Sequence, residues 1–271
     1  MASAKPLDTM DFEQLPLVAD LPVPEQQPAP LPMVTLGARA GSAPAAAAAA
    51  AAASAPKAKI SLPAPPEGAP AYWAEACRQL VRRDRVMKRL IPRFAHLALQ
   101  PGGDAFATLA RSIVGQQISM KAAQTLWNKF ARLPARMAPD LVLKLKVDDM
   151  RAVGLSARKV DYLVDLAMHF TEHRLHQDDW QGMSDEAIVA ELMSIRGVGR
   201  WTAEMFLIFY LQRPNVLPLD DAGLISGISQ NYFSGDPVSR SEAREVAEAW
   251  KPWCTVATWY IWRSLEPQPA A

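Results

Sequence analysis

The most informative segment is residues 192–203, LMSIRGVGRWTA, in which two glycines flank one valine. Apolar residues recur at helical spacing before and after it, which predicts two amphipathic helices joined by a tight turn. Gly197 and Gly199 permit a positive φ and allow another backbone to approach closely. The second helix begins directly after them, so its free N–H groups can bind a phosphate without a lysine. A bare Gly-x-Gly is also typical of an ordinary turn with Val198 as a buried plug, so the turn alone assigns no function.

The composition separates a long N-terminal segment from the rest of the 271 residues. Residues 1–70 are rich in Pro and Ala, include the alanine run Ala45–Ala53, and contain Phe12 as their only aromatic residue. Such a segment buries too little apolar surface to offset the entropy lost on ordering, so we expect a disordered tail. Residues 71–266 are then expected to form one domain. The net charge of the chain, +1, is too small to argue for nucleic-acid binding by itself.

Several classes of protein are excluded by what the sequence lacks. Its two cysteines, Cys77 and Cys254, are too few for an iron–sulfur cluster, which takes about four thiolates, and no paired histidines complete a zinc site. We expect both thiols to be reduced and buried. No apolar run reaches the roughly 20 residues that span a bilayer, and early acidic residues argue against a signal peptide. We therefore expect an intracellular protein with no membrane partner.

Helix signals recur through the predicted domain. Asp104, Ser184 and the Ser-x-x-Glu box beginning at Ser239 are typical N-caps, and Ser119 is placed to begin another helix. Pro252 can occupy the first turn of the last helix. No segment alternates polar and apolar residues as a strand does, so the sequence predicts an all-α fold.

Two adjacent acids, Asp220 and Asp221, follow the proline-containing loop 214–218 and precede a predicted helix. Capping of that helix explains one acid well. It explains two poorly, because adjacent acids at one cap partly repel each other. One of the pair is therefore a candidate for chemistry.

Together with LMSIRGVGRWTA, the string SIVGQQIS at residues 112–119 resembles the helix-hairpin-helix DNA glycosylases. The resemblance extends over roughly residues 72–265. It implies a fold of two helical subdomains with the active site in the cleft between them. Members of this family often bind one monovalent cation, Na⁺ or K⁺, through hairpin carbonyls, which here correspond to Met193, Ile195 and Val198. The resemblance implies no other cofactor.

The same resemblance assigns roles to the acids and to two glutamines. The catalytic aspartate of the family stands at the head of the helix after the hairpin, which here is Asp221, with Asp220 as cap or support. Its anion would stabilise the positive charge that builds on the deoxyribose as the N-glycosidic bond breaks. Gln117 lies at the position of the wedge that fills the gap left by a flipped base, with Gln116 beside it. On the residues alone, the glutamines are also explained as a polar pair that ends a helix.

The C-terminal stretch 250–263, WKPWCTVATWYIWR, resembles the branch of the family that removes 3-methyladenine-type lesions. In that branch the tryptophan corresponding to Trp262 lines a cavity in which an electron-deficient base stacks, and Trp201 is the second candidate for this base pocket. Indole favours cationic methylpurines over neutral bases by ~0.5–2 kcal/mol through a cation–π interaction. Met205 departs from some relatives that carry an aromatic residue there, which implies a pocket that is either narrower in substrate range or reshaped. A tryptophan stripe is also typical of a hydrophobic core.

We therefore expect a monofunctional glycosylase that excises alkylated purines, of the 3-methyladenine and 7-methylguanine type, in base excision repair. Its expected partner is double-stranded DNA containing alkylated bases, and we expect a monomer associated with the nucleoid of a bacterial-type cytoplasm. Relatives that also cut the DNA backbone carry a nucleophilic lysine where Trp201 stands. Two alternatives remain: a bifunctional glycosylase/lyase for oxidised bases, and a helix-hairpin-helix DNA-binding module without catalysis, which would not need Asp221.

Overall fold

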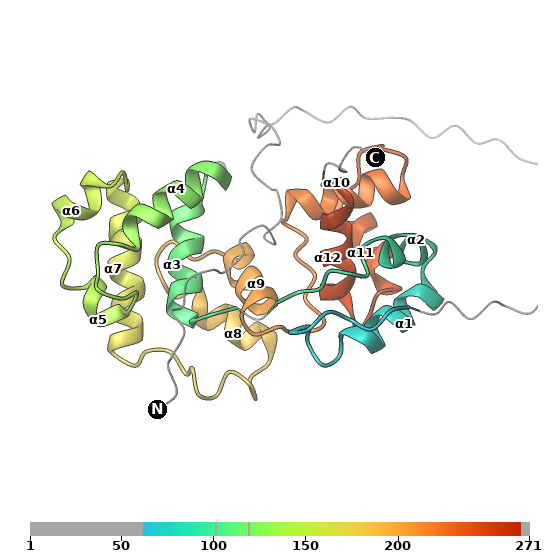
Figure 1. Ribbon diagram of the computed structural model, residues 1–271, viewed down its shortest axis with the longest axis horizontal. Coiled ribbons are helices and arrows are strands. Elements are labelled where there is room, and N and C mark those ends of the chain that lie inside the picture. The colour runs from blue at the N-terminus through green and yellow to red at the C-terminus, as the bar shows by residue number, and fades with distance from the viewer. Residues whose placement is uncertain (1–61, 101, 119, 267–271) are drawn as a thin grey trace, which may run out of the picture. The chain divides into compact units, whose positions relative to one another are not determined.

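The computed structural model describes residues 62–100, 102–118 and 120–266, and every regular element within them is a helix. The disorder predicted for residues 1–61 and the helix start predicted at Ser119 lie outside these residues. The twelve helices of the described chain (Figure 1) are α1 (Trp73–Arg83), α2 (Arg85–Arg93), α3 (Ala105–Gly115), α4 (Met120–Phe130), α5 (Pro139–Val142), α6 (Val147–Ala152), α7 (Ala157–Thr171), α8 (Asp185–Leu192), α9 (Arg200–Phe209), α10 (Ala222–Tyr232), α11 (Arg240–Glu248) and α12 (Cys254–Ser264).

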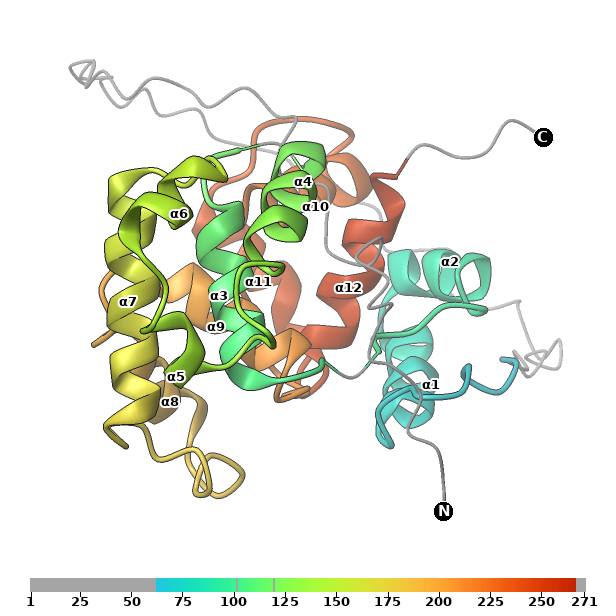
Figure 2. The same ribbon diagram turned by 60° about the vertical axis from the view of Figure 1, so that its left-hand side comes forward.

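The helices pack in two groups (Figures 1 and 2). In the first, α3 packs against α4, α7 and α9, while α5 and α6 pack on α7 and α8 packs on α9. In the second, α12 packs against α1, α2 and α10, and α10 also contacts α11. The predicted all-α fold with two helical subdomains is confirmed.

Three of the predicted N-caps are confirmed, at the starts of α3, α8 and α11. The side chains of Asp104 and Ser184 accept hydrogen bonds from the backbone of the first turns of α3 and α8. Ser239 and Glu242 form the expected capping box at the start of α11. These starts depend on residues three positions apart, so local sequence suffices to predict them.

The start predicted for the last helix is wrong. α12 begins at Cys254, so Pro252 lies before the helix rather than in its first turn. The reason is a turn that precedes the helix, in which the backbone N–H of Trp253 donates to the carbonyl of Trp250 at 2.8 Å.

The second group is built around α12, whose residues from Cys254 to Arg263 are all buried. A Cβ on Gly227 of α10 would lie 2.3 Å from Cγ2 of Ile261 on α12, so the two helices approach closely because position 227 has no side chain. This approach places the start of α10 beside α12.

The folded region begins earlier than residue 71. Leu62 and Ala69 pack against the core, and α1 starts at Trp73. These proline-rich residues, which the sequence analysis placed in the tail, supply apolar contacts without forming a helix.

Cys77 and Cys254 are both buried and unpaired with each other, as predicted. Over the residues that the structure describes, no helix combines the length and apolar character needed to cross a membrane.

Candidate active site

Asp221 is the N-cap of α10 and is fully buried. Its Oδ1 accepts hydrogen bonds from the backbone N–H of Leu224 at 2.7 Å and from Nε1 of Trp262 at 2.8 Å. Its Oδ2 accepts one from Nε1 of Trp201 at 2.9 Å. All three partners are donors, and an ionised carboxylate only accepts, so this arrangement suits the anion.

The two indoles reach Asp221 from different helical groups, Trp201 from the first turn of α9 and Trp262 from α12. Trp262 is 2% exposed and stacks on Phe209, with ring centroids 5.9 Å apart and planes inclined by 13°. Trp201 is half-buried. Two of the three predicted pocket residues thus contact Asp221 directly. The third, Met205, is buried one helical turn beyond Trp201 on α9.

Gly223 has no side chain, and this leaves space for the contact between Asp221 and Trp262. A Cβ there would lie 3.1 Å from Oδ1 of Asp221 and 3.4 Å from Cδ1 of Trp262. The sequence analysis missed this residue. The available signal was a glycine two positions after the candidate acid, repeated four residues later at Gly227.

Asp220 points elsewhere. It is exposed and forms an ion pair with Arg240 at 2.6 Å. The cap expected of Asp220 is made by Asp221, whose backbone has the extended conformation of an N-cap, with φ −82° and ψ 114°. The side chain of Asp221 therefore bonds to the first turn of α10, and Asp220 remains exposed at the surface. A supporting role for Asp220 stays a prediction.

The turn between α8 and α9 uses its two glycines differently. Gly197 has a φ of +85°, and a Cβ there would lie 2.2 Å from Cδ2 of Tyr162. Gly199 has a φ of −93° and caps α9, and nothing lies within 4 Å of a Cβ placed on it. Of the two glycines, only Gly197 uses the positive φ that glycine permits, because Gly199 is an N-cap and takes extended backbone. Val198 is buried as a plug, so the open approach to the turn lies at Gly199.

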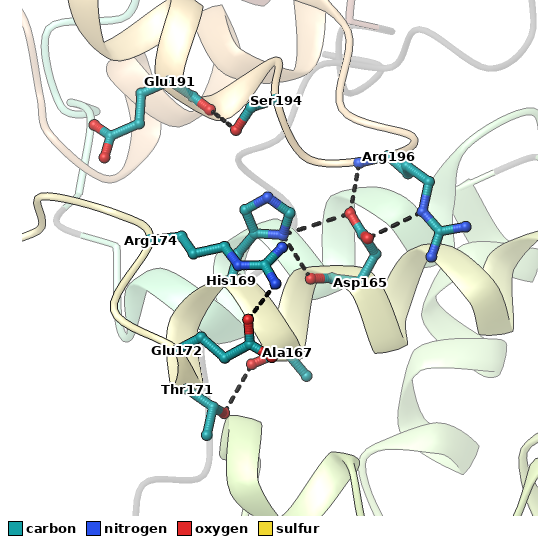
Figure 3. Close-up of polar contacts among 9 residues, drawn as sticks. All are labelled: Asp165, Ala167, His169, Thr171, Glu172, Arg174, Glu191, Ser194 and Arg196. Carbon is teal, nitrogen blue, oxygen red and sulfur yellow. Dashed lines mark hydrogen bonds and ion pairs between the residues drawn. The ribbon is translucent and has the colours of Figure 1, made fainter.

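Asp165 on α7 holds this turn in place (Figure 3). Its carboxylate accepts from the backbone N–H of Arg196 at 2.8 Å and from Nε of the same residue at 3.0 Å. Nδ1 of His169 lies 2.8 Å from the Asp165 carbonyl oxygen and 3.5 Å from its carboxylate. Burial by itself would raise the pKa of Asp165, but the hydrogen bonds and charge of Arg196 hold that pKa below its usual value. A charged Asp165 thus anchors the residue before Gly197. No local pattern marks this contact, since the partners are 31 residues apart.

The loop after α3 carries the two predicted wedge residues in different settings. Nε2 of Gln116 donates to the carbonyl of Gly197 at 2.8 Å, which connects this loop to the hairpin. Gln117 is exposed and has a φ of +60°, a left-handed conformation that non-glycine residues seldom adopt. Such backbone strain is concentrated at functional sites. The geometry therefore separates an outward residue, Gln117, from a supporting one, Gln116.

Glu204 on α9 is a second acid that the sequence analysis did not single out. Its side chain is 12% exposed, and its nearest cation is Arg200, with Nη1 3.9 Å from Oε1. Within the described residues, its Oε2 is buried without a hydrogen-bond partner. Burial raises the pKa of Glu204 to about 7; Arg200 opposes this shift, and the charges of Asp220, Glu186 and Asp221 add to it.

Two of the three carbonyls expected to hold a monovalent cation, those of Met193 and Ile195, keep free acceptor capacity. Met193 is the C-cap of α8, so its carbonyl lies beyond the helical hydrogen-bond ladder. The carbonyl of Ile195 accepts from the backbone N–H of Val198 at 3.1 Å and keeps a second lone pair. Backbone carbonyls are ligands that K⁺ accepts in place of its hydration shell. Cation binding here stays a prediction.

Comparison with known proteins agrees with this geometry. A family model described as "HhH-GPD superfamily base excision DNA repair protein" matches residues 110–252. DNA-3-methyladenine glycosylase 1 of Schizosaccharomyces pombe is 30% identical over 165 residues, which cover 59% of this chain and 72% of the relative. The DNA-3-methyladenine glycosylase of Saccharomyces cerevisiae is 34% identical over 149 residues, 51% of this chain and only 50% of the relative.

The solved structure of the Schizosaccharomyces pombe 3-methyladenine DNA glycosylase in complex with abasic DNA is similar as well. It superposes with a TM-score of 0.63 at 28% identity, over 70% of this chain and 96% of that one. With the hairpin, the enclosed aspartate and the two helical groups in place, this chain belongs to the HhH-GPD superfamily of base excision DNA repair proteins and groups with its 3-methyladenine DNA glycosylases.

Proposed function

We propose that this chain is a monofunctional DNA glycosylase that releases alkylated purines from duplex DNA by hydrolysing the N-glycosidic bond. The observation that carries the proposal is the enclosed carboxylate of Asp221, which accepts from the indole N–H groups of Trp201 and Trp262. The relatives named as DNA-3-methyladenine glycosylases support the choice of substrate class.

The chemistry requires an anion close to the sugar. As the glycosidic bond breaks, positive charge builds on the deoxyribose, and a carboxylate in a water-poor site stabilises that charge. The same carboxylate can orient the attacking water. An alkylated purine already carries positive charge and leaves readily, so the reaction needs no strong general acid.

Access to Asp221 requires a side chain to move, because its carboxylate is fully buried. Trp262 lies in the core against Phe209, whereas Trp201 is half-buried at the start of α9. We infer that the flipped nucleotide displaces Trp201 and stacks on an indole face, where cation–π attraction favours a methylated base by ~0.5–2 kcal/mol.

Binding of the duplex is assigned to the hairpin and to the loop after α3. Phosphates approach the open side of Gly199, where the N-terminus of α9 presents free N–H groups. Gln117 fills the gap left by the flipped base, which offsets part of the few kcal/mol that flipping costs. A Na⁺ or K⁺ ion at the carbonyls of Met193, Ile195 and Val198 would add positive charge to the turn that the DNA phosphates approach. The protein is proposed to act as a monomer on double-stranded DNA.

Trp201 also decides between hydrolysis and backbone cleavage. It stands where family members with lyase activity carry a lysine, and indole has no nucleophilic amine. Water is therefore the proposed nucleophile, and the product is an intact abasic site.

The test uses methylated duplex DNA with and without sodium borohydride. We expect release of free 3-methyladenine and 7-methylguanine, no borohydride-trapped adduct, and strand breaks only after alkali. A robust trapped adduct would favour the bifunctional alternative. Binding without any base release would favour the non-catalytic module.

A further inference from the structure

A second surface of the first helical group has the features of a nucleic-acid site. A groove of about 480 Å³ lies between α4 and the turn that joins α6 to α7. Its lining is apolar except for two lysines and a threonine, and consists of Ile118, Lys121, Ala122, Thr125, Leu126, Lys129 and Val153. No acidic side chain is among these residues.

The packing of α4 explains why this face is open. The opposite side of the helix faces α3, where the side chain of Arg111 lies over the ring of Trp127 at 5.6 Å. Leu126 reaches the α6–α7 turn, and its Cδ1 lies 3.5 Å from a Cβ placed on Gly154. The side chains of Lys121 and Lys129 are left on the exposed rim.

Among the residues that the structure describes, no acidic side chain neutralises either of the two lysines. Within the described residues neither one forms an ion pair, whereas Lys144 lies near Asp140 and Lys251 pairs with Glu248. Lysines without an ion-pair partner, next to the apolar lining of the groove, suit a ligand that is anionic on one side and apolar on the other.

The groove continues from the wedge loop. Ile118, which lines it, directly follows Gln117, the outward residue with left-handed backbone. In a duplex with Gln117 inserted into its base stack, the neighbouring backbone would therefore lie next to Lys121.

The spacing of the lysines allows them to contact two different phosphates of one DNA strand. They are eight residues apart on one helix, which at 1.5 Å per residue is about 12 Å. Along one strand of B-DNA, phosphates follow each other at about 3.4 Å of axial rise, so the two ammonium groups meet different phosphates. The apolar floor between them then faces deoxyribose.

We propose that the groove between α4 and the α6–α7 turn binds the sugar–phosphate backbone of the duplex next to the flipped nucleotide, with Lys121 and Lys129 on separate phosphates. This inference rests on the proposed function, since it takes DNA as the ligand. It adds a contact surface beyond the hairpin, on a helix that no part of the enclosed site uses, and it explains how a chain with little net charge holds a polyanion.

The experiment measures the affinity of the full chain for undamaged and for abasic duplex DNA between 50 and 300 mM KCl, by fluorescence anisotropy. The test variant is Lys121→Ala/Lys129→Ala. The matched control is Lys88→Ala/Lys146→Ala, which removes the same charge from exposed lysines outside the groove. Each lost phosphate contact lowers the slope of log K against log[salt] by about 0.9. We therefore expect a slope smaller by about 1.8, and binding weaker on the order of 10-fold at 0.1 M salt, on both duplexes alike.

A third variant, Lys121→Arg/Lys129→Arg, keeps both charges and should restore the wild-type slope. An unchanged slope in the alanine variant, or an equal fall in the control, would overturn the proposal. In either case wild-type excision of methylpurines would still support the proposed function. Failure of the wild-type protein to bind duplex DNA or to release bases would instead remove the proposed function itself.

Discussion

Asp221 divides its two oxygens among one backbone N–H and two indole N–H groups, so a substitution there changes charge and hydrogen bonding together. Asparagine keeps the shape but offers one acceptor oxygen instead of two. Its NH₂ group then faces an N–H donor, and the lost hydrogen bond costs about 1–2 kcal/mol.

Asp221→Asn should therefore abolish release of methylpurines, lower Tm by a few degrees and leave DNA binding largely intact. Single-turnover excision, thermal unfolding and anisotropy measure the three effects. Asp220→Asn is the matched control, because that acid is exposed and paired with Arg240. An inactive Asp220→Asn beside an active Asp221→Asn would show that the roles of the two acids are reversed.

Glu204 makes stability depend on pH. The pKa of Glu204 is raised by burial to about 7 in the folded protein, against an ordinary value of 4.5. Between these values the folded protein keeps a proton that the unfolded chain has released. The contribution of Glu204 to the free energy of unfolding is thus fully present below about pH 4.5. It is lost as the pH rises to about 7, and the loss is on the order of 1–3 kcal/mol.

Glu204→Gln stays neutral and should lack this loss. Urea unfolding at pH 5, 6, 7 and 8 should show wild type and variant converging at low pH and the variant more stable at pH 8. Parallel curves for the two proteins would mean that Glu204 ionises normally.

At the level of secondary-structure elements, the hairpin between α8 and α9 combines two roles. One glycine provides the positive φ of the turn, and the other faces the surface proposed to bind phosphate. Gly197 is held against Tyr162 with a positive φ, while Gly199 faces open space with ordinary backbone. Asp165 of α7 and Gln116 of the loop after α3 both bond to this turn. Its position is therefore set by two other elements of the same helical group.

The two glycines should respond differently to alanine. Gly199→Ala adds a methyl group where phosphate approaches, so we expect weaker binding to damaged and undamaged duplex with Tm nearly unchanged. Gly197→Ala forces a strained φ and displaces the Tyr162 ring, at a cost of about 2–4 kcal/mol. Anisotropy and thermal unfolding of both variants separate the effects. Normal DNA binding by Gly199→Ala would assign the turn a structural role only.

At the level of the whole molecule, the proposed catalytic carboxylate of Asp221 is enclosed where the two helical groups meet. Asp221 begins α10, Trp262 lies on α12 and Trp201 begins α9. The close approach of α10 to α12 at Gly227 keeps the first two in register.

Gly227→Ala should destabilise the protein by about 1–3 kcal/mol, because its Cβ would overlap the Ile261 side chain. It should also slow base release, since α10 carries Asp221. Gly115→Ala near the end of α3 is the matched control, because its Cβ would meet Ala123 at an ordinary 3.6 Å. Denaturant unfolding and excision rates distinguish the two. Equal stability of both variants would contradict the close packing of α10 on α12.

Features that depend on neighbouring residues could be predicted from the sequence alone. The helix starts at Asp104, Ser184 and Ser239 follow from side chains that bond the backbone within three residues. The tight turn follows from two glycines between amphipathic segments, and the family from the strings around it. Each of these is a local rule, which the order of residues expresses directly.

The enclosure of one of two adjacent acids follows from the fold rather than from neighbouring residues. Capping rules and spacing do not distinguish Asp220 from Asp221, and only the family resemblance selected Asp221. In the fold, partners 20 and 41 residues from Asp221 surround it, while Asp220 pairs with Arg240 outside. The different demands on Gly197 and Gly199, and the raised pKa of Glu204, likewise arise from distant neighbours. The physical reason is that burial, desolvation and steric exclusion depend on atoms that the fold brings together, and no spacing along the chain encodes them.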